Sequence, residues 1–352
     1  ADGSDGPYLL VASLNASDTA FIDTALAGST ALSATTGQRT ARPDAGLTVD
    51  PGTIIKLDGA RIDVTFGAHF YAEGTAERPV IMTSLADNRY GAGGTFDTNS
   101  TNTTDALSHG DWAGLYVGFG GAASIDHAVI AGGGGISRIP GGFASFNAIE
   151  VHQGELRVAN SRFEMNDDGR EVVNVDDPDR GGRSDNASGT IFVRAAQPVI
   201  ANNTFIGGYG PVGTFDVNSF SFNEVTDAGR STGRIDMVRS TGNSGPLIQG
   251  NRLAQDEDLP DTVDRFGLNG IEVRGGAVST EVVLDDVDIV HIVRDTIEIP
   301  NQHIYGGMRL ESDARGSLVV KFEGATAGIV AGGNLQTSED QFQDIADRIG
   351  GS

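Results

Sequence analysis

The sequence predicts an all-β protein in which short parallel strands stack into a repeating solenoid. Apolar runs of four to six residues, rich in Val and Ile, alternate with clusters of Gly, Asn and Asp, which is typical of strands separated by turns. A six-residue pattern recurs along the chain, and Gly supplies 50 of the 352 residues. Helical periodicity is confined to a weak segment at residues 16–32 and a clearer one at residues 338–349.

The composition excludes several classes of protein. The formal net charge of −24 should repel phosphate backbones and anionic lipids, so we expect no nucleic-acid binding. The absence of Cys excludes disulfides, thiolate nucleophiles and cysteine zinc sites. No apolar run approaches the ~20 residues that cross a bilayer, so we expect no membrane insertion. The low Lys and high Asp content fits either a secreted protein in a saline setting or an Arg- and Asp-rich genome.

The recurring pattern is six residues long. Its first and last positions are apolar, its third position is His, Asn or Gly, and the other three positions vary. Its four copies occupy residues 125–130, 158–163, 200–205 and 248–253. The third position carries residues that suit tight corners, because Asn and Gly tolerate the left-handed backbone conformation. Stacked corners could place Asn160 above Asn202 in a side-chain hydrogen-bond ladder, although Asn is also common in ordinary turns.

A second pattern, a short strand after a small residue, occupies residues 148–151, 190–193 and 270–273. It precedes the first pattern by the same interval in two places, so a strand, a bend and a second strand form one unit. The spacings between units, 33, 42 and 48 residues, indicate a coil of roughly 20–25 residues with variable inserts. We expect stacked inward rows made of Ile149, Val151, Val158, Phe163, Ile191, Val193, Ile200 and Phe205.

The chain divides into an N-terminal segment, residues 1–50, which is a candidate cap, and a repeating region at 51–352. Three polar or Gly-rich stretches, residues 86–110, 131–146 and 167–189, are predicted to be excursions from the wall. Loops on a rigid scaffold are common places for binding.

Several stretches carry a resemblance to a known family. They read PGTIIKLDGARIDVTFGAHFYAEGT (51–75), ERPVIMTS (77–84), HGDWAGLYVG (109–118), NGIEVRGGAVSTEVVLDDVDIVHIVRDTIEIP (269–300) and YGGMRLESDARGSLVVKFEG (305–324). Together they resemble bacterial extracellular right-handed parallel β-helix proteins, which are modules of large surface or secreted proteins. The resemblance implies a right-handed parallel β-helix with long loop excursions, and residues 347–352 look like the entry to a further coil. It implies little about activity.

The acidic stretch at residues 167–189 is the candidate metal site. Six of its carboxylates could together supply the oxygen ligands that Ca²⁺ prefers: Asp167, Asp168, Asp176, Asp177, Asp179 and Asp185. Their spacing does not match an EF-hand, and a solvated loop without bound metal is the alternative. A second acidic cluster, Asp285, Asp286 and Asp288, alternates with apolar residues, so we expect it on the outer face of a strand.

The single tryptophan, Trp112, is the candidate ligand-binding residue. Placed among glycines, it could be a platform on which a sugar ring stacks. The alternative is a large core residue that closes one layer of the solenoid, which the resemblance supports.

The function that we expect is structural: an extracellular module of a bacterial cell-surface or matrix assembly, serving structure or adhesion. Parallel strand edges at the solenoid ends invite pairing, so the expected partners are other copies or neighbouring modules. One alternative is a polysaccharide lyase or glycoside hydrolase of the β-helix type, but no residue can be chosen as catalytic. Of the six His, only His127 and His152 fall within repeat units, and His152 is expected to face solvent. The other alternative is a carbohydrate-binding module.

Overall fold

The computed structural model describes residues 45–65, 67–96, 106–139, 142–169, 186–216, 247–253, 268–278, 282–299 and 307–332. Apart from one short 3-10 helix, η2 (Gly94–Phe96), the regular structure in these residues is β-strand, so the predicted all-β class is confirmed. The helical segments expected at 16–32 and 338–349 lie outside the described residues, as does most of the candidate cap.

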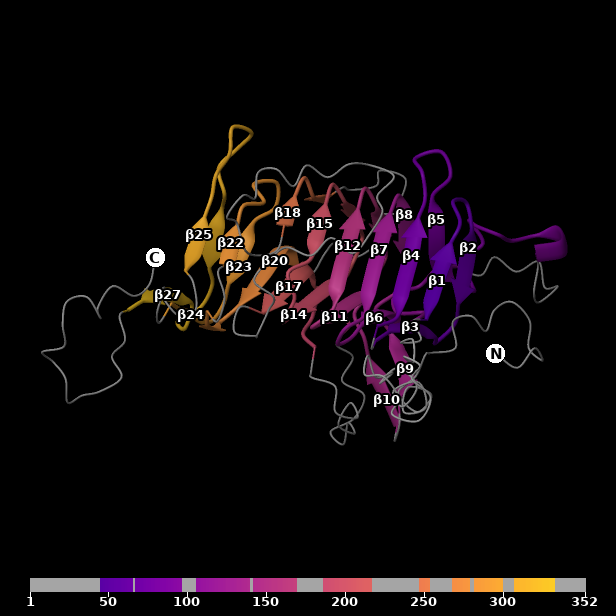
Figure 1. Ribbon diagram of the computed structural model, residues 1–352, viewed down its shortest axis with the longest axis horizontal. Coiled ribbons are helices and arrows are strands. Elements are labelled where there is room, and N and C mark those ends of the chain that lie inside the picture. Colours follow the sequence, from indigo (N-terminus) through magenta and orange to yellow (C-terminus); the bar gives the residue numbers. More distant parts are fainter. Residues whose placement is uncertain are drawn as a thin grey trace, which may run out of the picture.

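Three parallel sheets run side by side along the long axis of the molecule (Figure 1). Sheet I contains β1 (Gly46–Val49), β4 (His69–Glu73), β7 (Ala122–Asp126), β12 (Glu155–Ala159), β15 (Val199–Ala201) and β18 (Leu247–Gln249). Sheet II contains β2 (Ile54–Leu57), β5 (Val80–Ser84), β8 (Ala128–Ala131), β13 (Arg162–Glu164), β16 (Thr204–Ile206) and β19 (Arg252–Leu253). Sheet III contains β3 (Arg61–Val64), β6 (Gly114–Val117), β11 (Ile149–His152), β14 (Ile191–Arg194), β17 (Pro211–Asp216), β20 (Leu268–Arg274), β23 (His291–Val293) and β26 (Val320–Phe322).

The chain visits these sheets in rotation, I then II then III, and each strand pairs in parallel with its counterpart one visit later. We call each set of three consecutive strands, one in each sheet, a level. After β20, sheets I and II stop and two smaller parallel sheets begin, while sheet III continues. These smaller sheets are β21 (Gly276–Ala277), β24 (Thr296–Ile299) with β27 (Gly328–Ala331), and β22 (Val282–Leu284) with β25 (Met308–Leu310).

The interior is made of stacked rows, as the sequence predicts. Ile149 lies beside Ile191 and Val151 beside Val193 in sheet III, and Val158 lies beside Ile200 in sheet I. In sheet II, Phe163 lies beside Phe205. All eight residues predicted to point inward are buried, so the predicted inward rows are confirmed.

The four corners of the six-residue pattern adopt the left-handed backbone conformation. Their φ angles are 45° at His127, 50° at Asn160, 57° at Asn202 and 67° at Gly250. The four copies of the pattern lie at consecutive levels, so the unequal spacing comes from chain inserted between levels.

An asparagine ladder exists, but one position beyond the predicted one. The amide oxygen of Asn203 accepts a bond from the Ser161 N–H at 3.0 Å, and that of Asn251 accepts one from the Asn203 N–H at 3.1 Å. The side-chain nitrogens of Asn203 and Asn251 donate inward to Val158 O at 3.0 Å and Ile200 O at 2.8 Å. Asn160 instead donates to Asp126 at 2.9 Å. The corner residue points its side chain away from the interior, and its successor points inward.

Two predicted excursions are visible in the described residues. Residues 131–146 contain a hairpin of β9 (Ile136–Ile139) and β10 (Gly142–Ser145), which projects from the body (Figure 1). Among the described strands, these two pair antiparallel and the others pair in parallel. Tyr90, from the described start of the stretch at residues 86–110, packs on sheet II near Ile81 and Val129. Parallel pairing already begins at β1, so the repeating region starts inside the segment expected as a cap.

Candidate functional site

Trp112 lies in the apolar interior and not on a surface. Its side chain is 0 % exposed, and its indole Nε1–H donates to Ala131 O at 2.8 Å. The sugar-stacking interpretation of Trp112 requires an exposed ring face, and this structure does not provide one. The core interpretation fits the observed position.

The acidic excursion leaves and rejoins the wall at one point, held by two asparagines. Asn147 Nδ2 donates to Asp168 O at 3.2 Å and to Gly189 O at 2.6 Å, bridging both ends. Asn186 Nδ2 donates to Gly169 O at 3.1 Å and to Asn147 Oδ1 at 2.7 Å. The two described ends of the stretch, residues 167–169 and 186–189, are therefore held side by side, and residues 170–185 lie outside the described residues.

The structure describes two of the six predicted calcium ligands. The Asp167 carboxylate accepts a bond from the Asp168 N–H at 2.7 Å, and the Asp168 carboxylate accepts one from the Ser188 hydroxyl at 2.8 Å. The other four, Asp176, Asp177, Asp179 and Asp185, lie outside the described residues. Within the described part of the chain, no group of three or more His, Cys, Asp or Glu side chains is placed to hold a metal ion. Calcium binding stays a prediction.

Ionisable side chains on the outer side of the wall are buried in pairs. His152 Nε2 lies 2.7 Å from Glu150 Oε1, between the rings of Tyr116 and Phe192. His152 is buried, so its expected exposure to solvent is wrong. On sheet I, Arg157 Nη1 lies 3.0 Å from Asp126 Oδ2, and both side chains are 0 % exposed.

The first excursion is clipped to sheet II by an ion network. Asp87 accepts bonds from Arg89 and from the Thr83 hydroxyl, and Arg89 Nη1 also lies 2.6 Å from Glu164. Burial alone raises the pKa of Asp87, but the bonds from Arg89 and Thr83 outweigh it and hold this pKa below its usual value. These contacts fix a loop on the wall.

The last described level has no further strand beside it among the described residues. The strands β25, β26 and β27 are each the last strand of their sheet. Phe322 pairs with the buried Val293 and Leu310 with the buried Leu284, so both belong to inward rows. Nevertheless Phe322 is 49 % and Leu310 47 % exposed. Among the described residues, the last level is therefore open at these two apolar positions.

The expected position of the second acidic cluster, on the outer face of a strand, is wrong. Asp285, Asp286 and Asp288 form the turn between β22 and β23, and Asp286 is fully buried. Burial raises the pKa of Asp286 to about 6. Burial, together with repulsion from Asp286 and Glu311, raises the pKa of Asp285 to about 6. An Asp-rich turn directly after an apolar strand is the sequence signal that identifies this position.

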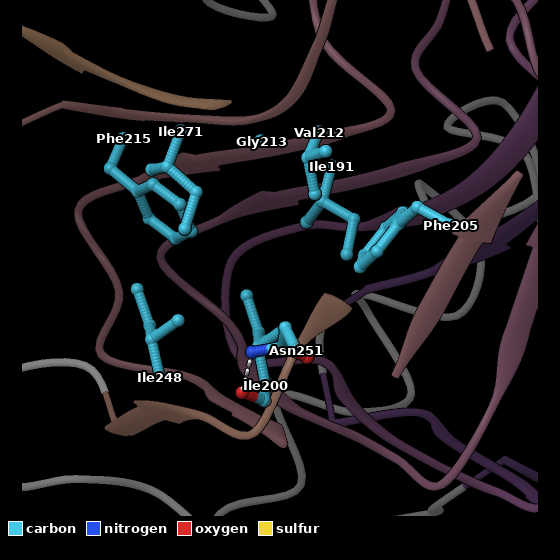
Figure 2. A pocket seen from close by; sticks show the side chains of 9 residues that line it. All are labelled: Ile191, Ile200, Phe205, Val212, Gly213, Phe215, Ile248, Asn251 and Ile271. Atoms are coloured by element: carbon cyan, nitrogen blue, oxygen red, sulfur yellow. Dashed lines mark hydrogen bonds between the residues drawn. The ribbon is translucent and has the colours of Figure 1, made fainter. Parts of the chain in front are cut away.

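His291 is an inward residue that the sequence analysis did not single out. It stands in the row of Ile271 and Val320, it is fully buried, and neither ring nitrogen has a hydrogen-bond partner. Burial lowers its pKa to about 4. Two strands earlier in sheet III, Gly213 occupies the same row without a side chain. A small apolar cavity lies there, bordered by Ile191, Phe215 and Ile271, with Asn251 at its edge (Figure 2).

Comparisons with protein-family models, with curated proteins and with solved structures found no match for this chain. Among the described residues, no helix has the length and apolarity needed to cross a membrane.

Proposed function

We propose that the chain is a right-handed parallel β-helix that serves as an extracellular structural or adhesion module of a bacterial surface or matrix assembly. The rotation of consecutive strands through three parallel sheets supports the β-helix, and connections between parallel strands are right-handed in nearly all proteins. The resemblance of residues 51–75 and 269–300 to secreted β-helix modules supports the location. Sheet III, with eight parallel strands, would form one stiff wall.

The observation that carries the structural role is the open last level. An inward row that ends on a half-exposed Phe322 needs another apolar layer above it, and free parallel edges accept further strands. The first level offers matching edges at β1, β2 and β3. The partner that fits is another β-helix end, in a second copy or a neighbouring module.

Charge supports contact at the ends. Residues 307–332 carry three basic and three acidic side chains, and residues 45–65 carry two basic and three acidic ones. The chain as a whole carries −24, so its ends repel each other less than its flanks would. Because the remaining repulsion is screened by salt, association should strengthen as ionic strength rises.

The test is the oligomeric state of the full chain, measured by size exclusion with light scattering over a range of protein and salt concentrations. We expect concentration-dependent oligomers that Phe322→Asp weakens about tenfold or more, because a charge would replace an apolar contact. The matched control is Phe143→Asp, since Phe143 is 58 % exposed on the β10 hairpin and away from the ends. A parent chain that stays monomeric throughout contradicts end-to-end association.

The location and class of activity need a second measurement. In the producing cells, antibody against the chain should label intact cells, and deletion of the gene should weaken cell attachment or the matrix. Cleavage of an extracellular polysaccharide by the purified chain would favour the enzyme interpretation over the structural one.

A further inference from the structure

In the part of the chain that the structure describes, a seam lies between the strands β18–β19 and the strands β21–β22. Sheets I and II end there and the two smaller sheets begin, so sheet III is the sheet that crosses. The apolar interior divides in the same region. Ile271 belongs to the larger cluster, whereas Val273, two residues later on β20, belongs to the smaller one.

Side chains of the turn at residues 285–288 bridge this seam. Asn251 Nδ2 donates to Asp286 Oδ2 at 3.1 Å, and the Gly250 N–H donates to Asp288 Oδ2 at 3.1 Å. The other Asp286 oxygen accepts a bond from the Asp288 N–H at 3.0 Å. Asn251 is the last member of the asparagine ladder, so the turn receives the end of that ladder.

The groups that face the turn leave its carboxyls poorly neutralised. Glu311 and Arg315, from the chain after β25, also face the turn. However, each has its own ion-pair partner: Arg309 lies 2.6 Å from Glu311, and Asp313 lies 2.5 Å from Arg315. Arg315 lies 3.7 Å from the exposed Asp288. The β18–β19 corner offers only the Asn251 amide and a backbone N–H. Asp285 Oδ1 is buried without a hydrogen-bond partner.

We propose that this turn is an acid-tightened clasp, which holds the seam more firmly when Asp285 and Asp286 are protonated than when both are ionised. Asp286 is buried and the adjacent Asp285 is half-buried with one buried oxygen. Two such carboxylates repel each other and lose hydration, whereas their neutral forms keep acceptor oxygens and gain an O–H donor. The raised pKa values of both groups agree with this.

The direction with pH follows from linkage. A carboxyl whose pKa is raised on folding stabilises the closed seam fully below its unfolded value, and this contribution is lost as the pH rises through about 6. His291, on β23, works in the opposite sense, because its pKa is lowered by burial. The two effects are separable, because an Asp285→Asn substitution removes one carboxyl and leaves His291 in place.

The experiment is hydrogen exchange by mass spectrometry on the full chain at about pH 5 and about pH 7, corrected for intrinsic exchange rates. We expect the segments at residues 247–253 and 282–293 to open more readily at the higher pH. Each of the two carboxyls should contribute a factor of about ten to this increase. Peptides from β12 and β13 should show no such change. Asp285→Asn should slow exchange at the seam at the higher pH and flatten its pH dependence, whereas Asp58→Asn, at an exposed turn, should match the parent.

Equal pH trends at the seam and in β12–β13 would overturn the clasp, and so would an Asp285→Asn variant that exchanges like the parent. The result does not depend on oligomerisation, because the monomer fraction can be measured alone.

Discussion

The rings of Phe163 and Phe205 stack face to face, with centroids 4.7 Å apart and planes 10° from parallel. The two residues close successive copies of the same six-residue pattern and lie in register on β13 and β16. A sequence repeat is thus converted directly into a stacked row, because equivalent positions on parallel strands lie about 4.8 Å apart.

Phe163→Ala should lower the free energy of unfolding by ~3–5 kcal/mol, since it removes a fully buried ring and one partner of the stack. Chemical denaturation of the purified variant measures this. Phe143→Ala is the control, because Phe143 is largely exposed. If Phe163→Ala unfolds at the parent's midpoint, the inward register is wrong.

Asn203→Ala should lower the free energy of unfolding by roughly 2–4 kcal/mol, because it removes the side-chain partner of the buried Ser161 N–H and Val158 C=O. The neighbouring Asn202→Gly should be nearly neutral, since Gly accepts the φ of 57° that Asn202 adopts. Denaturation midpoints of the two variants decide between the observed ladder and the one predicted through the corner residues. A larger loss from Asn202→Gly would contradict the observed ladder.

His291→Leu should remove a loss of stability in acid. The folded pKa lies near 4, below the ordinary value of 6.5, so protonation destabilises the protein as the pH falls from about 6.5 towards 4. The full effect is on the order of 3 kcal/mol. Urea denaturation of parent and variant across this range should give curves that diverge towards low pH. Parallel curves would mean that His291 titrates normally in the folded state.

Calcium should stabilise the chain through the acidic excursion. A site that binds only the folded state adds about 2.7 kcal/mol at a hundredfold excess of ion over Kd. Thermal melting with calcium and with EDTA measures this, and Asp176→Asn with Asp177→Asn should abolish the difference. An unchanged melting midpoint, with no calcium retained after gel filtration, would leave the loop solvated and unliganded.

Local pattern was sufficient to predict the inward rows, the corners and the excursion at residues 131–146. These depend on alternation and on residues that tolerate positive φ, both of which are visible in a single repeat. The shifted ladder was not predictable, because the direction in which Asn202 and Asn203 point depends on how the corner turns. The burial of Asp286 and His291 was not predictable for a similar reason. Both look like exposed residues until the seam and the last levels are stacked around them.

The central claim is that this chain forms one continuous right-handed parallel β-helix, and electron cryomicroscopy of the purified full chain tests it most directly. We predict an elongated particle with strands about 4.8 Å apart along its axis, in which the chain passes through three sheets in rotation and sheet III runs unbroken from β3 to β26. Antiparallel pairing within sheet III, or a break in sheet III between β17 and β23, would contradict it.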